Sequence, residues 1–148
     1  EEFFKAKSFG NWDILISFSN GKIKECHSTS KPAESIGDCA TSLLVFSYAG
    51  KNYFSISLNF AGEVAIGDVE SVVLHVGKMR HGLKLQQGGA HTFSSLQDKA
   101  IINDIIYENA TQNSFFTVET HTKDGAKSVD KYSIGRLLDS MIYMKKNC

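Results

Sequence analysis

The sequence predicts a mainly β fold: an antiparallel β-sandwich or partly open barrel of about eight strands, with one helix inserted late and a second helix at the C-terminus. Three observations lead to this prediction. Apolar and polar residues alternate through the first half of the chain, turn-forming residues separate the alternating runs, and helical spacing of apolar residues occurs only in two late segments. With 148 residues, 42% of them hydrophobic, the chain is long enough for one core, and we expect residues 1–148 to form a single domain.

The first predicted strand covers Trp12 to Phe18, where apolar side chains occupy every second position. Asn20-Gly21 follows, a dipeptide that favours a two-residue hairpin turn. The return strand is predicted from Lys22 to Ser28 and contains Cys26. Residues 28–41, which hold the only proline of the chain, are predicted to form a loop.

A second pair of strands is predicted at Leu43 to Tyr48 and Tyr53 to Phe60. The latter alternates apolar and polar residues throughout, as expected for an antiparallel sheet that packs on one face only. Ser71 to Val76 and Leu83 to Gln86 are predicted as further strands, with a turn near Gly77.

The inserted helix is predicted after Phe93. Ser94 to Gln97 has the spacing of a capping box, and Asn109 is a suitable C-terminal residue. Apolar residues then recur at helical spacing: Leu96, Ala100, Ile101, Ile105 and Ile106.

The end of the chain is predicted to form a hairpin and a second helix. The hairpin strands are Phe115 to Thr122 and Ser128 to Ile134, joined by a turn at Asp124-Gly125. The helix is predicted from Arg136 to Asn147, with one apolar face that packs on the sheet. This face consists of Leu137, Leu138, Met141, Ile142 and Met144.

Charge and hydropathy argue against two kinds of partner. Sixteen basic and sixteen acidic residues give a formal net charge of zero, and no run of basic residues exceeds a pair. Nucleic-acid-binding proteins present a basic surface, so we expect no nucleic-acid partner. Apolar runs such as Ser71 to Leu74 are far shorter than the roughly 20 residues that cross a bilayer, so we expect no transmembrane segment. We expect the partner to be another protein.

The N-terminus and the cysteines indicate a compartment. The chain begins at Glu1 without an initiator methionine or an apolar leader, and we expect that a signal peptide has been removed. None of Cys26, Cys39 and Cys148 has the spacing of a metal or redox motif. A free thiol at Cys148 is readily oxidised, whereas a disulfide there favours an oxidising compartment.

Loop length alone does not decide which cysteine pairs with Cys26. In the chain-entropy model, a bond to Cys148 closes a loop of about 120 residues and stabilises the fold by roughly 4–5 kcal/mol. A bond to Cys39 closes a loop of about 14 residues and contributes roughly 3 kcal/mol. Geometry overrides a difference of this size, so both pairings stay open at this point.

The residues that carry chemistry do not have the spacing of a catalytic or metal site. There is no G-x-S-x-G motif, and the neighbours Cys26 and His27 point to opposite faces of one strand. The five histidines show no HxH or HExxH pattern: His27, His75, His81, His91 and His121. We therefore expect no catalytic residue, no metal ion and no cofactor, and a protein that is not an enzyme.

Several short motifs, strongest over residues 98–148, are similar to those of one known family. They are Trp12, Cys26, Asp98 to Ile102, Phe116 to Val118, Asp124-Gly125, Tyr132 to Ile134, Met141, Met144 and Cys148. Through them the chain resembles the invasion-associated locus B family of small exported bacterial proteins. The resemblance implies a β-sandwich, a periplasmic or secreted location, and a role at the bacterial envelope or in host-cell association and virulence. It also implies a Cys26–Cys148 disulfide, with Cys39 free or in a minor alternative pairing.

Three functional hypotheses follow. The first is an exported, non-enzymatic binding or accessory protein of a bacterial envelope. The second is an inhibitor of a hydrolase, which would present a projecting loop at residues 28–41 or 86–92. The third is a small-ligand-binding β-domain, which requires at least two of His75, His81 and His91 to converge on a cavity.

Overall fold

The computed structural model describes residues 2–37, 41–48, 50, 53–61, 69–85, 92–94, 98–110 and 115–148. Within these residues the chain forms eleven strands and two helices. The strands are β1 (Phe3–Phe9), β2 (Trp12–Ser19), β3 (Lys22–Ser30), β4 (Glu34–Gly37), β5 (Thr41–Tyr48), β6 (Phe54–Ala61), β7 (Val69–Val76), β8 (Met79–Leu85), β9 (Thr92–Ser94), β10 (Phe115–Thr122) and β11 (Lys127–Ser133). The helices are α1 (Asp98–Ala110) and α2 (Gly135–Asn147).

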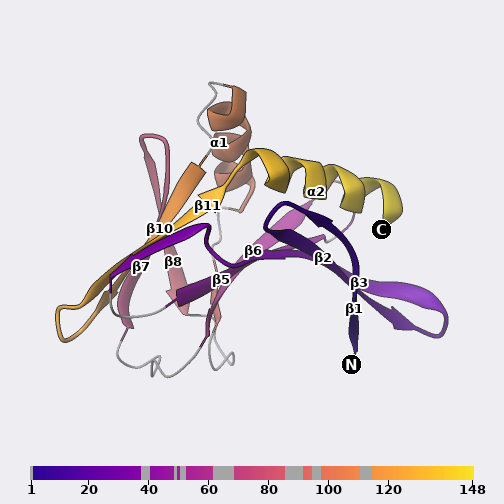
Figure 1. Ribbon diagram of the computed structural model, residues 1–148, viewed down its shortest axis with the longest axis horizontal. Helices are drawn as coiled ribbons and strands as arrows, with labels where there is room; N and C mark the ends of the chain where they lie inside the picture. The colour runs from indigo at the N-terminus through magenta and orange to yellow at the C-terminus, as the bar shows by residue number, and fades with distance from the viewer. Residues whose placement is uncertain are drawn as a thin grey trace.

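The strands form one antiparallel sheet in the order β1-β2-β3-β5-β6-β9-β8-β7-β10-β11-β4. The sheet curls into a half-barrel, with α2 lying along one half and α1 beside the other (Figure 1). Helix α2 contacts β1, β2, β3 and β5, whereas α1 contacts β6 and β7. The predicted fold class is confirmed, because the chain is mainly β with a partly open barrel, a late helix and a C-terminal helix.

The strand count exceeds the predicted number because three short or irregular strands were missed. Strand β1 has no clean alternation, since its register shifts between Lys5 and Lys7. Strand β9 has only three residues, and its backbone pairs with both β6 and β8. Ser94 lies in this strand, so it does not cap α1 as predicted, and α1 begins at Asp98. The rest of the predicted capping box lies outside the described residues.

The predicted loop at residues 28–41 is wrong over most of its described part. Strand β3 continues to Ser30, and residues 34–37 form β4, which pairs with β11. Polar composition concealed these strands, since β4 is exposed and needs no apolar alternation. Strand β8 also begins at Met79 rather than Leu83, while Gln86 lies outside the described residues.

The alternation of the central strands places one set of side chains in the core. On β2 the buried positions include Trp12, Ile14 and Ile16, and on β6 they are Phe54, Ile56 and Leu58. Residues directly opposite on neighbouring strands share a face, so each such row extends across the sheet. The concave face is therefore the apolar one, and both helices cover it.

A buried carboxylate joins two strands that are not neighbours in the sheet. Asp130 on β11 accepts hydrogen bonds from the Ser42 backbone N–H (2.9 Å) and the Ser42 hydroxyl (2.6 Å) on β5, and a third from the Ser35 hydroxyl on β4. The Tyr132 hydroxyl donates to the Ser42 carbonyl oxygen at 3.0 Å, and burial raises the Tyr132 pKa. These bonds cross the concave interior and join β5 to β11. We call this β5–β11 contact the seam.

Helix α2 packs on the sheet through Leu137, Met141 and Met144, as predicted. Ile142 is an exception among the predicted apolar positions, since 63% of it is exposed. Its position on the helix turns it away from the sheet. The Ser140 hydroxyl is buried instead, and it is hydrogen-bonded to the Ser28 hydroxyl of β3 at 2.6 Å.

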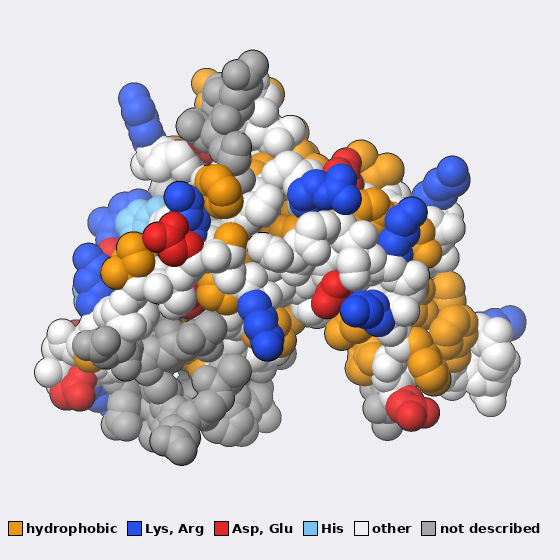
Figure 2. Space-filling model, in the orientation of Figure 1, with side chains coloured by type: hydrophobic (Ala, Val, Ile, Leu, Met, Phe, Trp, Pro, Cys, Tyr) orange, Lys and Arg blue, Asp and Glu red, His pale blue; other side chains and the backbone are white. Residues whose placement is uncertain are grey.

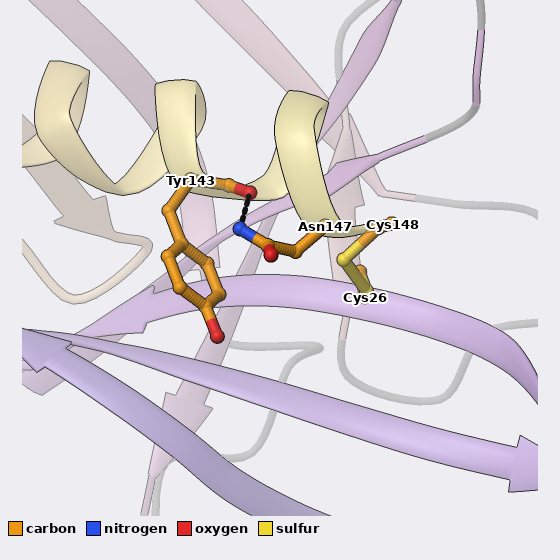
Figure 3. The surroundings of a disulfide bond; sticks show 4 residues. All are labelled: Cys26, Tyr143, Asn147 and Cys148. Atoms are coloured by element: carbon orange, nitrogen blue, oxygen red, sulfur yellow. Dashed lines mark hydrogen bonds between the residues drawn. A yellow bond between two sulfur atoms is a disulfide. The ribbon is translucent and has the colours of Figure 1, made fainter.

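A disulfide fixes the far end of α2. Cys148, directly after the helix, is bonded to Cys26 on β3, 122 residues earlier in the chain (Figure 3). The last turn of the helix is closed by a bond from the Asn147 side chain to the Tyr143 carbonyl oxygen at 2.9 Å. The predicted Cys26–Cys148 pairing is confirmed, while Cys39 lies outside the described residues.

Removing the buried carboxylate is expected to open the seam. Asp130→Ala leaves the donors of Ser42 and Ser35 without their acceptor, so we expect a loss of about 2–4 kcal/mol in the free energy of unfolding. Urea unfolding followed by circular dichroism measures this loss. Asp139→Ala, which breaks only the exposed ion pair with Arg136, serves as the control and should cost about 1 kcal/mol or less. Equal losses in the two variants would contradict the assigned role of Asp130.

Removing the disulfide is expected to cost roughly 4–5 kcal/mol, because the bond closes a loop of more than a hundred residues in the unfolded chain. The double variant Cys26→Ser/Cys148→Ser should unfold at correspondingly lower urea concentration. Peptide mapping of the unmodified protein without reductant tests the pairing directly. Recovery of a Cys26–Cys39 peptide, or of Cys148 as a free thiol, would show that the pairing is wrong.

Candidate functional site

A surface groove lies between β1, the first strand of the sheet, and α2. Its volume is about 610 Å³. Strand β1 contributes Lys7 and Phe9. Helix α2 contributes Arg136, Asp139, Ile142, Tyr143, Lys146 and Asn147. The groove thus combines aromatic, aliphatic and charged side chains from the two ends of the chain.

The spacing of residues on α2 explains why they line one groove. Arg136, Asp139, Tyr143 and Lys146 recur every three or four residues and therefore lie along one flank of the helix. The turn between β1 and β2 fits closely against this flank. A Cβ atom at Gly10 would lie 3.2 Å from Cγ of Arg136, and Gly10 has a φ of +59°, so a residue without a side chain suits the position.

The groove is positively charged. The Lys7 ammonium lies 5.2 Å from the ring centre of Phe9 and 5.6 Å from that of Tyr143. The Arg136 guanidinium lies 5.4 Å from the Phe9 ring and pairs with Asp139 at 3.0 Å. With Lys146 there are three cations and one carboxylate along the groove. Such a surface attracts anionic groups, and the aromatic rings hold the cations in place.

Exposed apolar residues gather at the adjoining end of the sheet. We call Phe4, Phe18 and Ile23 the apolar end cluster; Phe18 is directly opposite Ile23, whereas the exposed Phe3 points to the convex face. Phe4 and Phe18 are 54% and 53% exposed, and their ring centres are 6.4 Å apart. Phe4 is opposite the core residue Ile16, which is itself opposite Cys26, so Phe4 extends the apolar row of the disulfide to the edge strand. Figure 2 shows hydrophobic side chains exposed over this β1–β3 end of the molecule.

Two of the three candidate ligand histidines, His75 and His81, lie in the described residues, and they do not converge on one site. His81 is opposite Leu74 and is buried on the concave face, where its Nε2 lies 2.6 Å from the Asp104 carboxylate of α1. His75 follows Leu74 directly and so points to the other face. His91 lies outside the described residues. In the described ranges, no three His, Cys, Asp or Glu residues are arranged to hold a metal ion.

The other two histidines lie on the convex face. His27 is hydrogen-bonded through Nδ1 to the Ser47 hydroxyl at 2.7 Å, and its ring contacts Phe3. His121 is hydrogen-bonded to Glu119, its neighbour two positions earlier on β10. Cys26 is engaged in the disulfide, so the Cys26–His27 neighbours form no catalytic pair.

Glu119 is the centre of a charged cluster on the convex face. Its carboxylate lies 3.0 Å from Nε2 of His121, 3.1 Å from Nζ of Lys127 and 3.7 Å from Nε2 of His75. The hydrogen bond with His121, followed by the hydrogen bond and charge of Lys127, lowers the Glu119 pKa to about 2. The cluster connects side chains of β7, β10 and β11, and its ion pairs link these three strands.

No family model, curated protein or solved structure matches the chain. Among the described residues, no helix has the length and apolar character needed to span a membrane. The assignment of the groove therefore rests on the geometry of this chain.

Sequence reasoning missed the groove residues Lys7, Phe9, Arg136, Tyr143 and Lys146. Strand β1 was not predicted, so nothing placed it beside the last helix. The helical spacing of the four α2 residues was the available signal, but it has meaning only once the element opposite it is known.

Protonation of Glu119 in acid is expected to remove its ion pairs and the stability that they contribute. Because the folded-state pKa lies below the ordinary value of 4.5, ionised Glu119 stabilises the fold above about pH 4.5, and this contribution is lost as the pH falls toward about 2. We expect Glu119→Gln to cost on the order of 1–3 kcal/mol at neutral pH and much less near pH 2. Urea unfolding at several pH values measures this trend. Glu70→Gln, at an exposed position on β7, is the control and should leave the pH dependence unchanged.

Proposed function

We propose that the protein is an exported, non-enzymatic binding or accessory protein of a bacterial envelope, which acts by contacting another protein at the envelope or at a host surface. The apolar end cluster carries this proposal. Its three exposed apolar residues adjoin a groove with a net positive charge, and this combination is typical of a protein-binding surface.

The disulfide supports the proposed compartment. Thiols in a reducing cytosol are kept reduced, whereas Cys26 and Cys148 are bonded in the folded protein. The resemblance to the invasion-associated locus B family supports the same compartment, periplasmic or secreted, and the same kind of role.

The alternative hypotheses receive no comparable support. The hydrolase-inhibitor hypothesis used residues 28–41 as a projecting loop, but most of their described part belongs to β3 and β4. Its second loop, residues 86–92, lies outside the described residues except for Thr92. The small-ligand hypothesis needs two of His75, His81 and His91; the first two lie on opposite faces of the sheet, and His91 lies outside the described residues.

Export is tested by producing the full natural precursor with a C-terminal tag in its source cells and alkylating free thiols before lysis. We expect the tagged chain in the periplasm or the medium, with Cys26 and Cys148 protected from alkylation by their disulfide. A Cys148→Ser variant is the control, because it frees the Cys26 thiol for labelling. A cytosolic chain with both thiols alkylated would contradict the proposal.

The same cells test binding. A photoreactive benzophenone side chain at Phe18 is expected to give one discrete covalent adduct with another protein after irradiation. The matched control places the same group at Tyr107 of α1, an exposed aromatic position outside the apolar end cluster. Adduct formation at neither position, or to the same extent at both, would argue against binding through this surface.

A further inference from the structure

We infer that the open edge of β1, together with the groove beside α2, accepts an extended acidic segment of the partner protein as an additional antiparallel strand. This inference rests on the proposed binding function and names the chemistry of the partner. It is carried by the free edge, the charge along it and the shape of the groove.

Strand β1 offers the longer of the two edges of the sheet. It has seven residues, whereas β4, at the opposite edge, has four. All positions of β1 before Phe9 are exposed. In an antiparallel pair, alternate residues direct their N–H and C=O groups away from the partner strand, so β1 presents unpaired backbone groups on the side away from β2. A further strand can use these groups.

The charges along this edge select an acidic strand. The sequence of β1 contains two lysines and no carboxylate. Lys7 is opposite Ile14 and therefore lies on the concave side, whereas the register shift places Lys5, opposite Leu15, on the convex side. Within the described part of the chain, neither Lys7 nor Lys146 has a carboxylate within salt-bridge distance, and Arg136 has only Asp139. Acidic side chains on an added strand would neutralise these cations.

The groove gives such a strand room on its concave side. Side chains of an added strand alternate between the two faces. Those on the concave side would point toward the flank of α2 that carries Arg136 and Lys146, where the groove of about 610 Å³ is open. The rings of Phe9 and Tyr143 and the exposed Ile142 supply apolar contact for the carbon chains of glutamate residues.

A second copy of this chain fits the edge poorly. An antiparallel pair of two β1 strands would bring four lysine side chains together along a ladder of seven residues. Like charges on paired strands destabilise the pairing, and lysines on edge strands prevent association between copies. The concave groove would also keep its positive charge. The added strand must therefore come from a partner with the opposite charge.

The test uses the full oxidised protein and a fluorescent octapeptide in which glutamate and valine alternate. We expect saturable binding by fluorescence anisotropy and binding about ten-fold weaker when every glutamate is replaced by glutamine, since the charges are lost. Two further peptides carry N-methyl groups on all valine or on all glutamate amides. One of them should lose binding, because its donors face β1, and the other should keep it.

Variants locate the site. Lys7→Glu and Lys146→Glu should each weaken binding of the glutamate peptide about five- to ten-fold, with only a small change in the urea midpoint of unfolding. Lys84→Glu, at an exposed position on β8, is the matched control and should stay within about two-fold of the parent. The inference is overturned if the glutamate and glutamine peptides bind alike, or neither binds at millimolar concentration. It is also overturned if both N-methylated peptides bind like the parent, or if Lys84→Glu weakens binding as much as Lys7→Glu.

The experiments distinguish failure of strand addition to β1 from failure of the proposed function. If the photoreactive group at Phe18 still gives its adduct in cells while the acidic peptide does not bind, the protein binds a partner by a route other than strand addition to β1. If the peptide binds as described but the chain stays in the cytosol with reduced cysteines, the edge site holds and the proposed location is wrong.

Discussion

A carboxylate buried without a cation must be surrounded by hydrogen-bond donors, and the rest of this structure depends on how Asp130 meets that constraint. Its donors come from β4 and β5, whereas Asp130 itself lies on β11. Strands β5 and β11 are far apart in the order of the sheet, so Ser42 reaches Asp130 only because the sheet curls. The same seam is completed by Trp12 of β2, whose indole N–H donates to the Ser133 carbonyl oxygen at 3.0 Å. The half-barrel, and the core inside it, follow from this closure.

The seam also determines where the groove forms. Ser133 is the last residue of β11, and α2 begins two residues later, so the bond from Trp12 fixes the start of the helix over β2. The disulfide between Cys26 and Cys148 fixes its other end over β3. A helix held at both ends keeps one flank beside the edge of β1. The helix is therefore already ordered before a partner binds. Preorganisation of this kind favours binding, since little conformational entropy is lost when the groove is filled.

The sequence was informative where residues interact with near neighbours and uninformative where they interact across the fold. Alternation in β2, β6 and β10 predicted these strands because one side of each faces the core. Strand β4 is exposed and carries no such pattern. Loop length left two pairings open for Cys26, and the resemblance to a family, rather than physical chemistry, selected Cys148. The groove was not predictable, because it needs β1 and α2 side by side, and that placement depends on the seam.

The two edges of the sheet show how protection from self-association and recognition of a partner can come from the same residues. An unpaired edge is a liability in any β protein, since it offers backbone groups to other strands. Strand β4 limits this liability by being short. Strand β1 is longer and instead carries two lysines and a register shift between them. These lysines repel a second copy of the strand, yet the repulsion depends on the charge of the incoming strand. It turns to attraction when that strand is acidic, and the cations of α2 on the concave side add to this attraction. The lysines of β1 that keep two copies of the protein from pairing are therefore also the residues that favour an acidic strand over other strands at this edge.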